Sequence, residues 1–65
     1  MRISKRQVQI YMAKSGLNIK KLAERTGMKP QNLSTVLTRE TCRPDTAIRI
    51  ADALGVEAQE IIKGE

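Results

Sequence analysis

Residues 17–38 constrain the fold of this chain more than any other segment. They read as two short helices, Ile19–Thr26 and Pro30–Thr38, joined by a tight turn at Gly27. A turn this short requires a residue that accepts a positive φ, which glycine does without a steric penalty. Ala23 lies four residues before Gly27, at a place where two closely crossing helices leave room only for a small side chain. The spacing therefore predicts a pair of crossing helices.

The rest of the chain favours an all-α fold. Its 65 residues allow one domain, spanning 1–65, and a domain of this size buries only about 60% of the surface of the unfolded chain. The chain has no Phe or Trp and a single Tyr, and no runs of β-branched or aromatic residues with a period of two. Caps, stop residues and apolar faces predict five helices, at approximately 4–15, 19–26, 30–38, 44–54 and 57–63.

The first and last of these helices carry specific boundary signals. Ser4 is placed to cap the Gln7 amide while the Gln7 side chain reaches back, which is a capping box. Ile3 and Val8 have the spacing of a hydrophobic staple. Gly64 is expected to end the fifth helix. These signals predict a well-defined start for the first helix and a stop close to the C-terminal residue.

The charged residues are distributed unevenly along the chain. Residues 1–29 carry eight Lys and Arg residues against one Glu, a net charge of +7, whereas residues 30–65 carry a net charge of −2. The whole chain has a net charge of +5. One basic half and one acidic half are the electrostatic pattern of a protein that binds a polyanion. The charge pattern favours nucleic acid as the partner over a surface that is basic by chance.

Several other classes of function lack the residues they need. Cys42 is the only cysteine, so it has no disulfide partner and no set of metal ligands, and this composition suits a reducing cytoplasm. The chain has no His, no glycine-rich phosphate loop and no acid pair placed for catalysis. No apolar run reaches the roughly 18 residues of a membrane span. We therefore expect a cytoplasmic protein that is not an enzyme, with no catalytic residues, metal, cofactor, small-molecule ligand or membrane partner.

The motifs together resemble a known family. Besides the glycine turn, the helix end at Ala53-Leu54-Gly55-Val56 and the apolar pair behind it follow the same pattern; the motif residues are Gly16-Leu17-Asn18, Leu22-Ala23, Gly27, Ala53-Leu54-Gly55-Val56 and Ile61-Ile62. This pattern resembles the DNA-binding domain of lambdoid phage repressors and Cro proteins, the XRE-like helix-turn-helix family of phages and bacteria. The resemblance implies a compact five-helix, lambda-repressor-like domain. It also implies a sequence-specific transcriptional regulator of double-stranded DNA that works as a homodimer on a two-fold operator.

The same resemblance assigns roles to individual residues. It implies that Pro30–Thr38 is the recognition helix, whose N-terminal residues reach base edges in the major groove. The places that contact bases match Pro30, Gln31, Asn32 and Thr35. Gln31 has an amide that can donate and accept together, as bidentate reading of adenine requires, whereas Pro30 can only touch a thymine methyl or start the helix. The places that contact or attract phosphates match Asn18, Lys20, Lys21, Lys29, Ser34, Thr38 and Arg43. The alternative for Gln31 and Asn32 is that they are polar residues of a solvated helix.

The chain departs from the family pattern at three places. Many relatives begin the second helix with a Gln that grips a phosphate, and Ile19 stands there instead. Many also bury an Arg of the first helix against a Glu of the third, and the matching places here are Met12 and Leu37. Loss of both ionic partners together is consistent with the alignment, because a buried ion pair can be replaced by apolar residues with little loss of stability.

Two alternative functions and one surface remain open. The chain could be an antitoxin that represses its own operon. It could also be a protein-interaction module that kept the fold without reading DNA, which Ile19, Pro30 and the acidic residues Glu40 and Asp45 favour. A dimer surface is expected near the fourth and fifth helices, from Val56, Ala58 and Ile61, although core packing is the alternative for each of these three residues.

Overall fold

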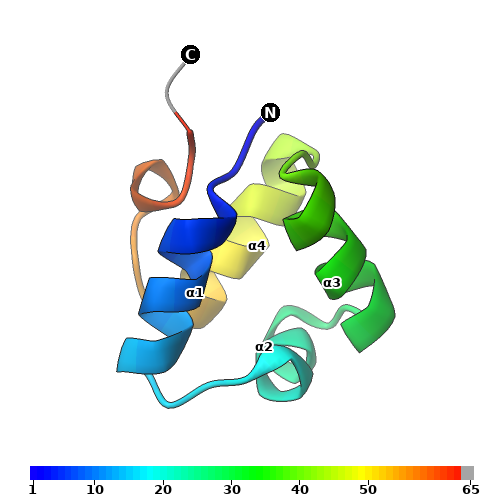
Figure 1. Cartoon of the computed structure of the whole chain (residues 1–65), viewed down its shortest axis with the longest axis vertical. Helices are drawn as coiled ribbons and strands as arrows, with labels where there is room; N and C mark the ends of the chain where they lie inside the picture. The colour runs from blue at the N-terminus through cyan, green and yellow to red at the C-terminus, as the bar shows by residue number, and fades with distance from the viewer. Residues whose placement is uncertain (64–65) are drawn as a thin grey trace.

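In the computed structural model, which describes residues 1–63, four α-helices enclose an apolar core (Figure 1). The elements are α1 (Lys5–Lys14), α2 (Ile19–Thr26), α3 (Pro30–Arg39), α4 (Pro44–Leu54) and the short 3-10 turn η1 (Ala58–Glu60). No β-strand occurs within residues 1–63, and the predicted all-α class is confirmed over that range.

The helices begin where the sequence signals predict. The Ser4 hydroxyl accepts the Gln7 N–H at 3.2 Å, and the Asn18 side-chain oxygen accepts the Lys21 N–H at 2.8 Å. Helices α3 and α4 each begin with a proline, whose missing N–H needs no partner in the first turn. The other half of the predicted capping box is not present, because the Ser4 N–H donates to the carbonyl oxygen of Ile61 at 2.7 Å instead.

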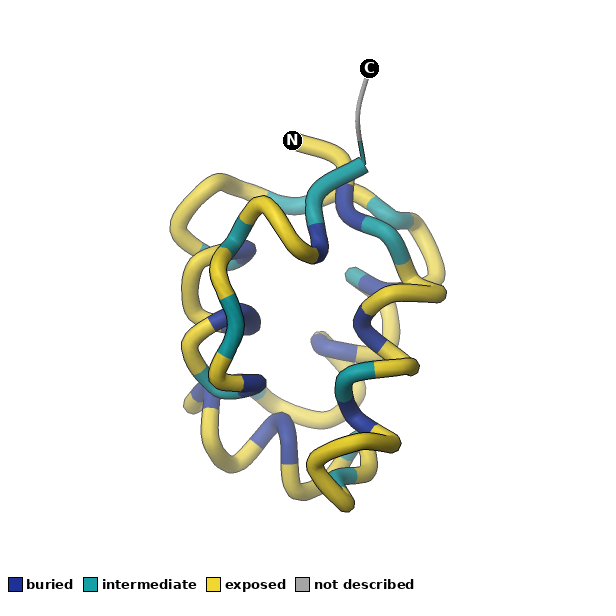
Figure 2. The backbone as a smooth tube through the Cα atoms, turned by 90° about the vertical axis from the view of Figure 1, so that its left-hand side faces the viewer, coloured by how far each residue is buried: buried dark blue, intermediate teal, exposed yellow. Residues whose placement is uncertain are grey.

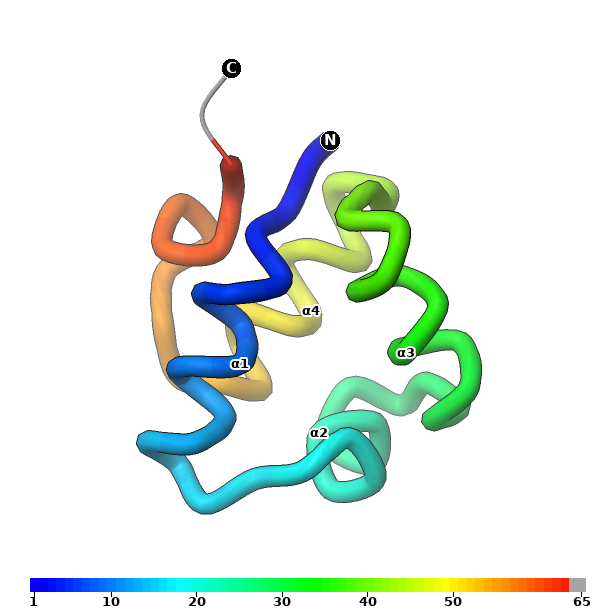
Figure 3. Tube along the Cα trace, in the orientation of Figure 1, coloured from blue at the N-terminus to red at the C-terminus, as the bar shows by residue number. Residues whose placement is uncertain are grey.

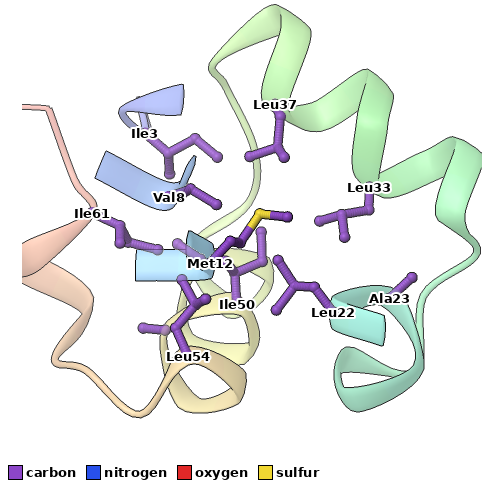
Figure 4. Close-up of a cluster of buried hydrophobic side chains, with 12 residues drawn as sticks. Ile3, Val8, Met12, Leu22, Ala23, Leu33, Leu37, Ile50, Leu54 and Ile61 are labelled. Carbon is purple, nitrogen blue, oxygen red and sulfur yellow. The ribbon is translucent and has the colours of Figure 1, made fainter. Parts of the chain in front are cut away.

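The core lies between all four helices and is built from aliphatic side chains and one methionine. Each helix turns its buried positions inward and its exposed positions outward (Figure 2). Ile3 and Val8 are both fully buried in this core, as the predicted hydrophobic staple requires. Figure 4 shows larger side chains of the core, such as Leu22, Leu33 and Leu37, pointing into the space between the helices. The buried core residues are Ile3, Val8, Met12, Leu22, Ala23, Leu33, Leu37, Ala47, Ile50, Ala51, Leu54 and Ile61.

Three segments that are distant in the sequence meet at one end of the molecule, and we call them the clasp. Residues 1–4 lie between residues 40–42 and residues 61–63 (Figure 3). Backbone hydrogen bonds of 2.7–3.0 Å join the first segment to both of the others. The pairings are two isolated antiparallel bridges, Arg2 with Thr41 and Ile3 with Ile62.

The clasp explains why the predicted fifth helix over residues 57–63 is not found. Only Ala58–Glu60 form a 3-10 turn, after which the chain pairs with the N-terminal segment. The Ile61 carbonyl and the Lys63 N–H bond to Ser4 and Arg2, so these groups are not available for a helix. The predicted stop at Gly64 lies outside the described residues.

Candidate nucleic-acid interface

The turn between α2 and α3 has the predicted conformation. Gly27 has φ 74° and ψ 13°, in the left-handed region, and its N–H ends α2 by bonding to the carbonyls of Ala23 and Glu24. Ala23 is fully buried, as a close helix crossing requires. A Cβ atom added at Gly27 would meet no other atom within 4 Å. Glycine is therefore needed here for its backbone conformation and not for space.

A buried hydroxyl reinforces this turn. Thr26 is the only buried polar residue among those described, and its hydroxyl donates to the Ala23 carbonyl at 2.9 Å. The same oxygen accepts the Met28 N–H at 3.3 Å, on the far side of Gly27. Thr26 is not among the residues that the sequence predicts to be important. A hydroxyl directly before the glycine was the available signal, since Thr side chains often bond to nearby backbone groups in turns.

Helix α3 separates its polar and apolar residues onto opposite faces. Leu33 and Leu37 are buried and hold the helix to the core. The outward face repeats at i, i+3, i+4 and i+7, and all its members are exposed: Gln31, Ser34, Thr35 and Thr38. This face presents one amide and three hydroxyl groups from a single helix.

The four residues predicted to contact bases are all exposed. Gln31 and Asn32 lie in the first turn of α3, beside Pro30, with their amides at the surface. Thr35 differs, because its hydroxyl donates to the backbone oxygen of Gln31 at 3.0 Å. Its hydrogen is thus used within the helix, and Thr35 offers a partner its methyl group and an acceptor oxygen.

The predicted phosphate-facing residues are also exposed. Ser34 and Thr38 lie on α3, and the others lie in the segments before and after it. Lys29 and Arg43 are the N-cap residues of α3 and α4, before and after the outward face in the sequence. Asn18 uses its amide oxygen to cap α2, so only its NH₂ group remains to donate to a phosphate. Helix α2, which packs against α3, carries further cations in its first turn, namely Lys20 and Lys21.

Arg39 is a further exposed cation, outside the predicted phosphate-facing set. The predicted helix ends at Thr38, one residue before it. The structure extends α3 by one residue, so Arg39 is exposed in its last helical turn. No glycine or proline in the sequence marks the end of this helix, so its last residue could not be predicted.

Glu40 ends α3, and its carboxylate contacts two other parts of the chain. Its carboxylate accepts the backbone N–H of Lys5 at 3.0 Å and lies 3.1 Å from the Lys63 ammonium. These two contacts, the Lys5 N–H first, hold the pKa of Glu40 below its usual value. Glu40 is one of the residues that favour the alternative of a protein-interaction module; in the structure its carboxylate is engaged within the chain, at the Lys5 N–H and at Lys63.

Two other titratable groups have shifted pKa values, and neither lies on α3. The Tyr11 hydroxyl donates to the Glu60 carboxylate at 2.6 Å, and this hydrogen bond raises the pKa of Tyr11. Burial raises the pKa of the Cys42 thiol, which keeps it in the neutral form. Across residues 1–63, no three ligand-type side chains gather as a metal site. Over the same range, no helix has the length and apolar character needed to cross a membrane.

Two packed helices with a tight turn between them and a polar, exposed second helix are the arrangement of a helix-turn-helix. Comparison with known protein families matches residues 7–65 to the Cro/C1-type HTH DNA-binding domain. The match covers most of the chain, and the chain therefore belongs to this family of DNA-binding domains. Comparisons with curated proteins and with solved structures give no significant match.

The places where the chain departs from the family pattern can now be located in the fold. Met12 and Leu37, which stand where many relatives have an ion pair, are both buried in the same core (Figure 4). Ile19 is half-buried and packs on this core. Ile61 is fully buried, so it cannot contribute to a dimer surface in this fold, whereas Val56 and Ala58 remain half-buried.

Proposed function

We propose that this protein is a sequence-specific transcriptional regulator of the Cro/repressor type, which lays α3 in the major groove of double-stranded DNA. The observation that supports this most directly is the outward face of α3. Its amide and hydroxyl side chains are all exposed while Leu33 and Leu37 anchor the opposite face. A helix held in this way can enter the groove without giving up its own packing.

The individual roles follow from side-chain chemistry. Gln31 and Asn32 read base edges through their amides, and Thr35 contacts a thymine methyl. Lys29, the N-cap residue of α3, and Arg43, the N-cap residue of α4, fix α3 on the backbone of the duplex together with hydroxyl and lysine contacts. The phosphate-facing set is Asn18, Lys20, Lys21, Lys29, Ser34, Thr38 and Arg43, to which we add Arg39.

One domain of this size reads only a few base pairs, so we further propose that two copies bind a two-fold operator. The protein then acts wherever its DNA is, in the cytoplasm. Selection of bound duplexes from a random pool tests both base reading by α3 and the binding of two copies. Enrichment of an inverted repeat supports both proposals, and enrichment of a single half-site supports base reading alone. No enrichment of any sequence would favour a protein-interaction module.

Single substitutions separate base reading from backbone attraction. Gln31→Ala is expected to weaken binding to the selected duplex by about 1–3 kcal/mol and to relax preference at one base pair. Lys29→Ala should weaken binding to all duplexes alike and reduce the dependence of binding on salt. Gln59→Ala is the matched control, because Gln59 is an exposed glutamine of η1, on the opposite side of α1 from α3 (Figure 1). Unchanged binding by Gln31→Ala would show that α3 does not read bases through this amide.

A further inference from the structure

We propose that Glu40 is a positioning residue for the recognition helix. In this proposal Glu40 contacts no base, and it sets the placement of α3 by holding the end of this helix to α1 and to residues 61–63. The proposal rests on the function proposed above, in which α3 reads DNA.

Glu40 joins more parts of the molecule than any neighbouring residue of the clasp. Its backbone forms the C-cap of α3. Its carboxylate caps the first residue of α1 through the Lys5 N–H, at 3.0 Å, and pairs with Lys63 at 3.1 Å. Its backbone oxygen accepts the Ile3 N–H at 3.0 Å. One residue therefore connects the end of α3 with the start of α1 and with the C-terminal part of the clasp.

The backbone of Glu40 adds an independent observation. Its φ of 55° and ψ of 33° lie in the left-handed region, and Glu40 is the only non-glycine residue with a positive φ among residues 1–63. This conformation is unfavourable for a residue with a long side chain and persists where surrounding contacts impose it. Glycine, the usual residue at such a helix end, has no carboxylate to make the contacts with Lys5 and Lys63.

The contacts that α3 makes with the rest of the molecule show why its C-terminal end matters for its placement. Among the helices, α3 packs most closely on α2, next to the Gly27 turn. At its C-terminal end, the hydrogen bonds that leave the helix for the rest of the molecule run through Glu40 and the adjacent clasp residues. Base reading requires side chains placed to within about 0.5 Å, so a small swing of this end reduces discrimination between sequences.

Charge and positioning predict opposite results for the same substitution. Removing a carboxylate from a protein that binds a polyanion strengthens binding to every duplex, if charge is all that changes. Loss of positioning instead weakens binding to the selected duplex, although the protein has become more positive. The sign of the effect at Glu40 therefore distinguishes the two roles.

The test compares Glu40→Gln with Glu57→Gln, which removes one carboxylate from the exposed N-cap residue of η1. The turn η1 lies on the far side of α1 from α3 (Figure 1). Binding is measured to the duplex selected from the random pool and to a random duplex. We expect Glu40→Gln to reduce the ratio of the two affinities by about tenfold, and Glu57→Gln to leave that ratio unchanged. A third variant, Glu40→Gly, removes the carboxylate while easing the left-handed conformation, so it retains the fold and should lose the same discrimination.

Residual dipolar couplings of the α3 amides, measured relative to those of α1 in the free protein, provide a readout that needs no DNA. We expect Glu40→Gln and Glu40→Gly to change these couplings and Glu57→Gln to leave them unchanged. Unchanged couplings, or selected-duplex binding as tight as wild type in both Glu40 variants, would overturn the proposal. If the wild-type protein itself fails to discriminate between duplexes, the proposed function fails, and the couplings still decide whether Glu40 orients α3.

Discussion

The two ends of α3 are built in different ways. The Gly27 turn before the helix uses glycine, a buried threonine and hydrogen bonds between residues no more than five positions apart. The Glu40 turn after the helix uses a charged residue in a left-handed conformation, with partners at Ile3, Lys5 and Lys63. Both residues adopt nearly the same backbone conformation, with φ of 74° and 55°. The first is stable through local preference, and the second requires tertiary contacts.

This difference has consequences for stability and for binding. A local turn forms whenever its own residues are present, so changes elsewhere in the molecule disturb it little. A turn held by distant segments depends on the N-terminal and C-terminal parts of the chain at once. We expect the stability of the Gly27 turn to depend on the backbone preference of the residue at position 27. We expect the stability of the Glu40 turn to depend on the charge of Glu40 and therefore on pH.

The largest expected effect is a loss of stability from a substitution in the apolar core, on which α3 packs between its two ends. Met12→Arg places an unpaired charge next to buried Leu37 and should reduce the free energy of unfolding by about 3 kcal/mol or more. Thermal and urea unfolding measure this loss. Ile10→Arg is the matched control, since Ile10 lies on the same helix and is 40% exposed. Equal melting temperatures for wild type and Met12→Arg would contradict the burial of Met12 beside α3.

A smaller effect is expected at the Gly27 turn. Gly27→Ala should reduce the free energy of unfolding by about 1 kcal/mol, because the left-handed conformation is strained for alanine while the added Cβ meets no atom within 4 Å. Gly27→Asn should cost less, since Asn tolerates this conformation. Urea unfolding of both variants checks the order. A loss several times larger for alanine would show that space, and not conformation, requires glycine here.

The smallest effect is a pH dependence specific to the Glu40 turn. The Lys5 N–H and Lys63, with a weaker contribution from Arg2, lower the pKa of Glu40 from 4.5 in the unfolded chain. The stabilisation that these contacts of Glu40 provide is complete above pH 4.5. It is lost as the pH falls through the lowered pKa of Glu40 in the folded protein.

Urea midpoints measured from neutral pH down into this acid range should therefore fall more steeply for wild type than for Glu40→Gln. Gly27→Ala should keep the wild-type pH dependence, because the hydrogen bonds of its turn involve no titrating side chain. Parallel acid curves for wild type and Glu40→Gln would mean that the Glu40 contacts add nothing to stability.

The features that could be predicted from the sequence depend on short-range preferences. The bounds of α2 and the first residues of α3 and α4 follow from Asn18, Gly27 and the two prolines, each acting within one helical turn. The outward face of α3 follows from the helical period, since buried Leu33 and Leu37 leave the polar positions on the other side. The roles of these polar residues in DNA binding remain predictions.

The features that were missed depend on segments that are distant in the sequence. No pattern within residues 57–63 indicates that Ile62 pairs with Ile3, and the apolar pair Ile61-Ile62 reads equally well as helix. The contacts of Glu40 could not be predicted from the sequence, because its partners Lys5 and Lys63 lie 35 and 23 residues away. Such pairings become visible only when the helices have been placed in space.

The family, the glycine turn and the helix that presents the polar face can all be recognised in the amino-acid sequence. These features are encoded by residues close together in the chain, where a cap, a left-handed glycine or an apolar period acts locally. How the far end of α3 is held, and why residues 61–63 pair with the N-terminal segment instead of continuing a helix, depends on the tertiary structure. The energy that sets those features comes from hydrogen bonds and an ion pair that form after distant segments have met.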